Sequence, residues 1–297
     1  PARNERRALG TTPMKLITWN VQWCRGLDGR VDAARIVQGA LAMADFDVLC
    51  LQEVASGYPE LPGDAGHDQP ALLRQLLPGF EVCFGAAVDE LAADGRSRQR
   101  FGNLVATRLP VLQVQHHALP WPTDDGLPGM PRLAVSATLR APWGTPLRVT
   151  TSHLEYYSQP ARLAQAQALH ALHVQSAARM ARPPDASNPV GPFRAKPHTV
   201  DAILTGDFNF PPDSAEYRAL TATVPGVPPL MDSWRVVHGS REHDPTFHVH
   251  DSTYSPTPVA CDFVFASGTV VPRLRRVEVD LATKASDHQP VLVELAD

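Results

Sequence analysis

The sequence predicts an α/β fold built as one domain. Helix and strand patterns alternate over the first 77 residues, and strand patterns then dominate to the C-terminus, interrupted by one long helix. Hydrophobic residues make up 43% of the 297 residues and charged residues 20%, the balance of an ordinary globular protein. Polar residues from both the N-terminal and the C-terminal half of the chain follow directly after apolar strand patterns. We therefore expect a single domain over residues 14–297, preceded by a flexible arm at residues 1–13.

The first third of the chain alternates strands with helices. Residues 15–21 (KLITWNV) are rich in β-branched and aromatic side chains and predict a strand that ends on a polar residue. Residues 31–44 repeat apolar side chains every three or four positions, which predicts a helix. The continuous apolar run at 47–51 predicts a strand covered on both faces. Residues 71–77 predict a short helix closed by a Pro-Gly pair.

The rest of the chain predicts mostly strands. A long helix interrupts them at residues 158–180, with Ser158 as its N-cap and Pro160 in its first turn. Residues 182–198 are rich in proline and polar residues and predict a surface loop. The predicted strands span residues 80–87, 103–107, 111–117, 133–139, 147–153, 200–204, 261–266, 273–279 and 291–295.

Composition limits both function and location. The chain has 31 acidic and 27 basic residues and a net charge of -4, which argues against a polycation that coats nucleic acid non-specifically. Its four cysteines form no paired motif, and Cys50 and Cys83 lie inside apolar runs, which predicts buried, reduced thiols. No stretch approaches the ~20 apolar residues of a membrane span, and residues 1–13 contain no apolar secretion core. We therefore expect a cytoplasmic protein without membrane contact or an obligate protein partner.

Acidic, amide and imidazole side chains recur where the apolar strands stop. They are Asn20, Glu53, His153, Asp207, Asn209, Asp262, Asp287 and His288. The loops that follow strand ends are where a rigid sheet presents binding and catalytic side chains. Each of these residues alone has an ordinary explanation as a turn former, a cap or a satisfied histidine. Eight of them together predict a shared site.

These residue types suit phosphoester cleavage assisted by a hard divalent cation. Mg²⁺ prefers oxygen ligands and takes one or two carboxylates, which Glu53 and Asp287 supply, with the amide oxygen of Asn20 beside them. A further aspartate kept ionised near the metal orients or deprotonates an attacking water. An Asp–His pair holds one imidazole tautomer and allows an imidazolium to face phosphate. The chain contains no Walker loop, no HExxH helix and no GxSxG elbow.

The motifs around these residues resemble those of the deoxyribonuclease-I-like endonuclease/exonuclease/phosphatase superfamily. In chain order they are TWNV at 18–21, LQEV at 51–54, GNLVATRLP at 102–110, TSHLE at 151–155, GDFN at 206–209, CDFV at 261–264 and ASDHQPV at 285–291. The resemblance spans residues 14–297, and its Gly-Asp-x-Asn and Ser-Asp-His pieces are the most specific. It implies a four-layer α/β/β/α sandwich of two mostly antiparallel sheets packed face to face, with helices outside and the active cleft at one edge.

The resemblance also implies a Mg²⁺- or Mn²⁺-dependent phosphodiesterase or phosphatase, with a metal-binding role for five residues. Glu53 would be the principal metal ligand, with Asn20 and Asp287 beside it. Asp207 would lie next to the metal and position or deprotonate the nucleophilic water. Asn209 would hold the phosphate or a second metal.

The catalytic roles implied by the resemblance fall on two histidines and their partners. Asp262 would orient His288, which would contact the scissile phosphate. His153 would stabilise the charge that develops on the phosphate oxygens. Either Asp207 or His288 would act as the base, and the sequence leaves that choice open.

The substrate is less well determined than the chemistry. Arg162, on the helix after His153, either supports the loop that follows His153 or lines the mouth of the cleft. Three further residues are candidates for substrate contact, namely Arg100, Asn103 and Tyr156. Arg100 lies in the basic run at residues 96–100, which is equally compatible with a solvated loop. We expect a phosphate-ester substrate, with nucleic acid as one candidate.

An alternative class of function is a non-catalytic regulator on the same fold that binds nucleic acid or a partner. It predicts the loss of metal-binding or nucleophile-handling residues, and the sequence retains them. His153 also stands where DNA-repair members of the superfamily place a tyrosine, and Gln22-Trp23-Cys24 replaces their Asp-Gly segment. Both departures point away from abasic-site repair and towards the general hydrolase branch.

Overall fold

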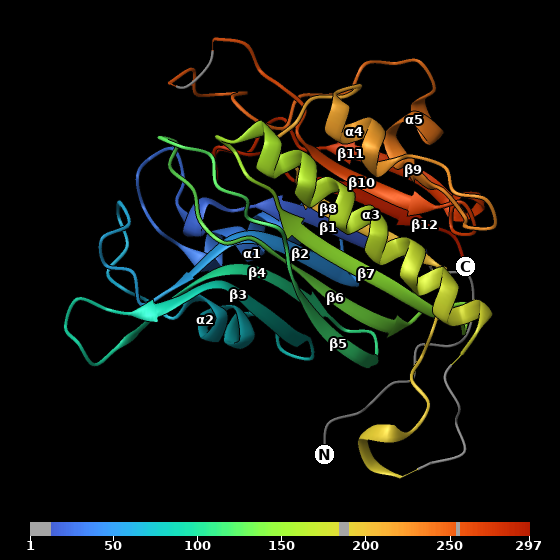
Figure 1. Cartoon of the computed structure of the whole chain (residues 1–297). Coiled ribbons are helices and arrows are strands. Elements are labelled where there is room, and N and C mark those ends of the chain that lie inside the picture. The colour runs from blue at the N-terminus through green and yellow to red at the C-terminus, as the bar shows by residue number, and fades with distance from the viewer. Residues whose placement is uncertain (1–12, 184–189, 254–255) are drawn as a thin grey trace.

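A computed structural model of the chain describes residues 13–183, 190–253 and 256–297. The expected arm at residues 1–13 lies outside the described residues except for Pro13, and so does the middle of the expected loop at 182–198. Within the described part, two six-stranded sheets pack face to face with helices on their outer sides (Figure 1). The expected two-sheet α/β sandwich is therefore confirmed.

The first sheet combines strands from both ends of the chain. It contains β1 (Met14–Asn20), β2 (Val48–Ser56), β3 (Glu81–Leu91), β4 (Arg98–Thr107), β11 (Leu274–Val279) and β12 (Val291–Leu295), in the order β11-β12-β1-β2-β4-β3. β1 and β2 are parallel, and the other neighbours are antiparallel. Helices α1 (Ala33–Met43) and α2 (Gln69–Leu76) pack on its outer face, with Asp32 and Asp68 as their N-caps.

The second sheet is built from the middle of the chain. It contains β5 (Val111–Ala118), β6 (Leu133–Arg140), β7 (Pro146–His153), β8 (Ala202–Asp207), β9 (Leu230–Asp232) and β10 (Asp262–Ser267), in the order β5-β6-β7-β8-β10-β9. β7 and β8 are its parallel pair. Helix α3 (Gln159–Ala181) covers its outer face and contacts α4 (Ala215–Leu220), while α5 (Ser233–His238) contacts β10 and β11. Three short 3₁₀ helices, η1 (Gln22–Cys24), η2 (Gly191–Phe193) and η3 (Val271–Arg273), lie in connections.

Side chains alternate along each strand between the core that separates the two sheets and the apolar layer beneath the helices on the outer face of that sheet. Leu16 of β1 and Val149 of β7 point between the sheets, whereas Ile17 of β1 packs beneath α1 and Leu204 of β8 packs beneath α3. Each large apolar side chain buried in these layers stabilises the fold by about 1.5–3 kcal/mol. The three apolar layers fix the two sheets relative to each other, and with them the strand ends at their shared edge.

The structure differs from the sequence-based boundaries where irregular backbone intervenes. The strand expected at 47–51 continues to Ser56, because a bulge between Leu51 and Val54 lets β2 keep pairing with β4. β4 begins at Arg98, so part of the basic run at 96–100 is strand rather than loop. The sequence patterns did not predict α4, α5 and β9, each six residues or shorter.

All four cysteines are buried and free, and for Cys50 and Cys83 this confirms the burial that their apolar surroundings predicted. Among the described residues, no helix is both long enough and apolar enough to cross a membrane.

Candidate active site

The two parallel strand pairs bring four polar side chains to one edge of the sandwich. β1 ends at Asn20 and β7 at His153, and His153 lies directly opposite Asp207 at the end of β8. Glu53 lies within the β2 bulge in a left-handed conformation, with φ of 58°. A non-glycine residue rarely adopts that conformation, and such residues concentrate at functional sites.

Asp207 is the centre of the cluster and is almost fully buried, at 1% exposure. Its Oδ2 accepts a hydrogen bond from Asn20 Nδ2 at 2.9 Å and lies 3.5 Å from His153 Nε2 and 3.6 Å from His288 Nε2. Its Oδ1 accepts from the backbone N–H of Asn209 at 3.0 Å. Both carboxylate oxygens are therefore held, and the side chain has a fixed orientation.

Asn20 links the carboxylate of Asp207 to that of Glu53. Its Nδ2 also donates to Glu53 Oε1 at 3.0 Å, while its Oδ1 accepts from the backbone N–H of Gln22 at 3.1 Å. Asn20 thus orients both carboxylates through its amide nitrogen. Its amide oxygen, which the sequence suggested as a metal ligand, faces the backbone of Gln22.

Asp287 approaches the cluster from the loop before β12. Its Oδ2 accepts from Gln22 Nε2 at 2.7 Å and its Oδ1 from Ser286 Oγ at 3.2 Å. Ser286 Oγ also donates to the backbone carbonyl of Asn20 at 2.8 Å, which ties this loop to the end of β1. Motif spacing did not predict the role of Gln22, because it depends on η1, whose three residues all have positive φ.

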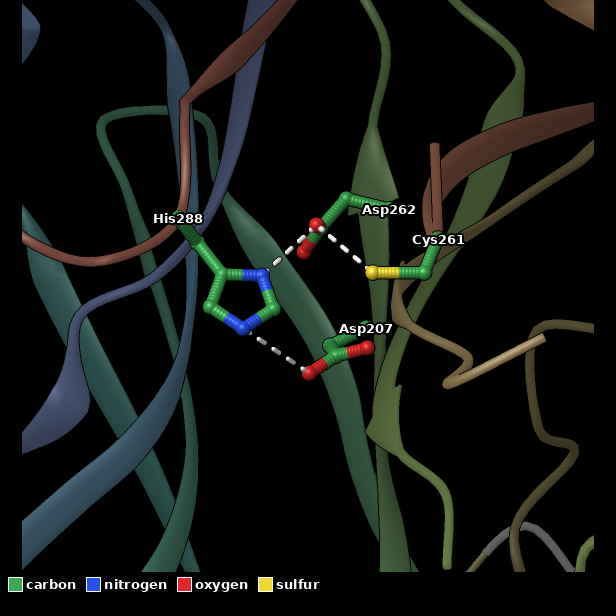
Figure 2. A group of neighbouring side chains, drawn as sticks. All are labelled: Asp207, Cys261, Asp262 and His288. Atoms are coloured by element: carbon green, nitrogen blue, oxygen red, sulfur yellow. Dashed lines mark hydrogen bonds and ion pairs between the residues drawn. The ribbon is translucent and has the colours of Figure 1, made fainter. Parts of the chain in front are cut away.

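Asp262 and His288 form a buried pair next to Asp207 (Figure 2). His288 Nδ1 lies 2.8 Å from Asp262 Oδ2, and its ring stacks on Phe247 with centroids 4.3 Å apart. Burial opposes a charge on His288, but Asp262 and Asp207 raise the pKa of its imidazole well above 6.5. His288 is therefore a cation that lies between two carboxylates.

His153 has the opposite electrostatic character. Burial, together with the nearby cations Arg132 and His288, lowers the pKa of His153 well below 6.5, so the ring is neutral at pH 7. Its Nδ1 is buried without a hydrogen-bond partner among the described residues. We assign the ring proton to Nε2, which lies 3.5 Å from Asp207 and 3.9 Å from Glu53.

Asn209 follows Asp207 in a tight left-handed turn, with φ of 53°. Its Nδ2 donates to the backbone carbonyl of Leu154 at 2.9 Å, and Leu154 N–H donates to the carbonyl of Asp207. Asn209 thereby joins the end of β8 to the loop that follows His153.

The carboxylates of the cluster repel one another when no cation lies between them. Burial, and then the charge of Asp287, raises the pKa of Glu53 to about 7, while burial also raises the pKa of Asp207. A set of carboxylate oxygens that is held apart from bulk water and is short of positive charge fits a hard divalent cation such as Mg²⁺ or Mn²⁺. The residues present therefore suit the expected metal.

Two groups of side chains in the described residues are compact enough to hold an ion, and they differ in chemistry. Glu53, His153 and Asp207 form one group, and Asp207, Cys261, Asp262 and His288 form the other. In the second group, burial and Asp262 raise the pKa of the Cys261 thiol well above 9, so it stays protonated and is a poor ligand. The first group, with Asp287 alongside, is the better metal site.

The weaker substrate-contact candidates lie at the margin of the cluster or away from it. Arg162 donates to the backbone carbonyls of both Glu155 and Tyr156, so it supports the loop after His153. Asn103 is buried and donates to the carbonyl of Leu133 between the sheets. Arg100 is partly exposed, 3.7 Å from Asp68, and Tyr156 is 43% exposed.

Sequence reasoning did not single out Arg132, although it lies close enough to His153 to lower that residue's pKa. Arg132 is only 6% exposed and lies 3.5 Å from Glu155 Oε2. Its Nη1 is buried without a partner among the described residues. The one available signal was its position directly before β6, since a lone arginine after a proline-rich loop has no distinctive pattern.

Comparison with known proteins identifies a family over most of the chain. The model of the endonuclease/exonuclease/phosphatase family matches residues 17–288. A search of curated protein sequences gives no match.

Solved structures resemble this fold over nearly its full length. An endonuclease/exonuclease/phosphatase from Beutenbergia cavernae superposes with a TM-score of 0.69 at 24% identity, covering 95% of this chain and 71% of the other. A mannosyl-6-phosphatase from Bacteroides thetaiotaomicron gives 0.64 at 20% identity, covering 95% and 99%. A 3′ phosphatase from Neisseria, bound to a product DNA hairpin, gives 0.60 at 22% identity, also covering 95% and 99%. At these identities the likeness shows a shared fold.

Proposed function

The chain belongs to the endonuclease/exonuclease/phosphatase family, and on that basis we propose that it hydrolyses phosphate esters with the help of a divalent metal. The observation that carries the proposal is the connected cluster of Asn20, Glu53, Asp207, His153 and His288 at one edge of the sandwich. It combines an acidic metal site, a fixed carboxylate and an imidazolium within one small volume.

Glu53 and Asp287 would hold the metal, with Asp207 at its margin. A bound Mg²⁺ or Mn²⁺ would polarise a phosphoryl oxygen and lower the pKa of a coordinated water. Asn20 orients Glu53 and Asp207 by donating to both, and it would become a ligand only if its amide turned over to present oxygen. Asn209, close to Asp207, remains our candidate for holding the phosphate or a second metal.

Asp207 would act on the attacking water, and the two histidines would bind the phosphate. His288, kept cationic by Asp262, would bind a non-bridging oxygen of the scissile phosphate, and the neutral His153 would donate from Nε2 to another. Because His288 already carries its proton, we assign the role of base to Asp207. The attacking water would form the new P–O bond as its proton moves to Asp207. The ester P–O bond would break with its electron pair on the leaving oxygen, which takes up a proton from solvent.

The proposed substrate is a phosphodiester or phosphomonoester. Among the structural neighbours, one is named as a 3′ phosphatase bound to DNA and another as a mannosyl-6-phosphatase, which supports a substrate class that includes both nucleic acid and phosphorylated sugars. Arg100 and Tyr156, both partly exposed, are the candidates for contact with the group that carries the phosphate. We also propose a reducing compartment such as the cytoplasm, supported by four free buried cysteines.

A substrate panel tests the proposal. Single-stranded DNA, duplex DNA, RNA, bis-aryl phosphate and sugar phosphates are each incubated with Mn²⁺, and then with a chelator in its place. We expect turnover of at least one substrate that disappears with the chelator and in the Glu53→Ala/Asp287→Ala double variant. Asp207→Asn should lose activity, while Asp213→Asn, which removes an exposed carboxylate 67% accessible to solvent, should keep it.

Two results would contradict the proposal. Activity that survives in the Glu53→Ala/Asp287→Ala variant would exclude the metal site. Inactivity of the parent on the whole panel with Mn²⁺ would favour the non-catalytic regulator instead.

A further inference from the structure

A polar cavity lies on the outer face of the second sheet, at the opposite end of β7 from the candidate active site. It encloses about 430 Å³ between that face, the C-terminal part of α3 and the segment around η2. We call it the Arg148 cavity, after the residue of β7 at its floor. Arg148 precedes His153 by five residues on one strand, so the two lie about 17 Å apart along β7. Figure 1 shows α3 running along the sheet between these two ends.

The floor of the cavity is polar where a covered sheet would normally be apolar. Alternation places Thr138 of β6 and Arg148 of β7 on the outer face, since their neighbours Ala137 and Val149 point into the core between the sheets. Thr138 is only 4% exposed. Polar side chains in such positions lose hydration and are seldom found there without a partner. A polar floor of this kind can form hydrogen bonds with a polar ligand, which an apolar floor could not do.

The charge of the cavity is entirely positive among the described residues. Its lining includes Arg148, Arg179, Arg194 and Lys196 and contains no aspartate or glutamate from the described part of the chain. Burial, and then the charge of Arg179, lowers the pKa of Arg148 to about 10. In a chain with more acidic than basic residues, four cations with no acidic side chain among the described lining residues form a strong local field for an anion.

His173 fixes Arg148 in place without neutralising it. His173 Nε2 lies 2.7 Å from the carbonyl of Pro228 and must donate to it, so Nδ1 is left to accept from Arg148 Nη2 at 3.1 Å. Arg148 Nη1 donates to the carbonyl of Thr199 at 3.4 Å. These two contacts use two of the five N–H groups of the guanidinium. The structure shows no hydrogen bond or ion pair between Arg179 and another described residue.

We propose that the Arg148 cavity binds a phosphate group, either as inorganic phosphate or on a small phosphorylated molecule, at a site separate from the candidate active centre. Two guanidinium groups offer forked pairs of donors that match the oxygens of a phosphate dianion and balance its charge. The hydroxyl of Ser176 and the amide of Gln115 line the same space and add neutral hydrogen-bonding groups. The volume falls within the range of small-molecule sites.

The proposal is tested by anion binding to the full chain without metal. Isothermal titration calorimetry and thermal unfolding are measured with inorganic phosphate, with glycerol phosphate and with sodium chloride at matched ionic strength. We expect both phosphates to bind and to raise the unfolding temperature, while chloride does neither. Tighter binding of glycerol phosphate would identify a phosphorylated molecule as the ligand, and equal binding would identify phosphate itself.

Variants separate this site from the candidate active centre. Arg179→Gln should weaken phosphate binding about tenfold or more, because it removes a charge-assisted contact from an exposed position that does not threaten folding. Arg182→Gln is the matched control, since it removes the same charge from the C-cap of α3 outside the cavity lining, and its affinity should stay within twofold. Asp207→Asn should also leave this binding unchanged.

Three outcomes would overturn the proposal. The first is phosphate affinity in Arg179→Gln equal to that of the parent. The second is loss of binding in Asp207→Asn with retention in Arg179→Gln, which would place the only phosphate site at the candidate active centre. The third is a response to chloride as large as the response to phosphate, which would show general screening of charge.

Discussion

At the residue scale, Asp262 is the clearest case of a side chain that acts through another. Its Oδ2 lies 2.8 Å from His288 Nδ1, whereas Asp207 approaches the other ring nitrogen, Nε2 (Figure 2). Its carboxylate fixes the imidazole orientation and, against the effect of burial, favours the charged form. Asp262 is therefore a positioning residue, and its contribution should appear in turnover rather than in substrate affinity.

We predict that Asp262→Asn lowers kcat about 100-fold or more while KM changes by only a few fold, because the variant keeps the shape of the pair but removes the charge that stabilises the imidazolium. Steady-state kinetics on the best substrate of the panel would measure this. Asp213→Asn is the matched control, since it makes the same change from carboxylate to amide at an exposed side chain that pairs with Arg235. A parallel loss of kcat in both variants, or a fall in unfolding temperature that accounts for the loss, would contradict the assigned role.

The individual residues also show how much of the candidate site could be predicted from the sequence. Eight polar strand-end residues were selected from their positions after apolar runs, and the structure brings all eight into one connected region. Gln22 was not selected, because its bond to Asp287 depends on three consecutive residues with positive φ. The amide direction of Asn20 was not predictable either, since it is set by the backbone N–H of Gln22.

At the element scale, the parallel pair of β7 and β8 determines where His153 and Asp207 meet. Gly206, directly before Asp207, has φ of 138° and lies against the backbone of Ser152 on β7. A Cβ at this position would collide with the carbonyl oxygen and carbonyl carbon of Ser152. The glycine of the Gly-Asp-x-Asn motif is therefore required by the close approach of the two strands.

We predict that Gly206→Ala destabilises the fold by more than about 3 kcal/mol, since backbone strain of about 1–3 kcal/mol adds to a clash with main-chain atoms that cannot move aside. Gly144→Ala is the control, because Gly144 also has positive φ, at 90°, but a Cβ there meets no atom within 4 Å. That variant should lose only about 1 kcal/mol, from strain alone. Urea unfolding would measure both changes, and equal losses would show that φ, and not the strand approach, decides the effect.

Elements also show where periodicity stops being informative. The long helix α3 was predicted to within a residue or two, because Ser158 marks its start and Pro160 is tolerated in its first turn. α4 and α5 each span six residues, too few for an apolar repeat to stand out. The order of strands within each sheet was not available from periodicity at all, since a strand pattern does not name its neighbour. The expectation of a two-sheet sandwich came from the resemblance of the motifs to the superfamily.

At the scale of the whole molecule, the net charge of -4 is a sum that includes two regions of opposite charge. Carboxylates gather at one end of β7 and β8, and the cations of the Arg148 cavity gather near the other end of β7. The total charge therefore said little about function, although it correctly argued against a uniform polycation. Each region is a place where the folded chain gathers like charges, so each should be stabilised by a counter-ion that binds the folded state alone.

We predict that Mn²⁺ at about 100 times its dissociation constant stabilises the parent by about 2.7 kcal/mol, because a ligand that binds only the folded state shifts the unfolding equilibrium. For a chain of this size that corresponds to a rise of roughly 4 °C in unfolding temperature. Thermal unfolding with and without the metal measures it. The rise should vanish in Glu53→Gln, which removes a carboxylate of the cluster while keeping its hydrogen-bonding shape.

The comparison must be made on the metal-induced rise and not on the unfolding temperature itself. Burial and Asp287 already hold the pKa of Glu53 near 7, so a neutral glutamine there relieves repulsion and raises the baseline of the variant without metal. Glu278→Gln supplies the matched control, since it removes an exposed carboxylate from β11 that pairs with Arg276, and its metal-induced rise should equal that of the parent. An undiminished rise in Glu53→Gln would place the metal elsewhere, and the absence of any rise in the parent would remove the metal site from the proposed mechanism.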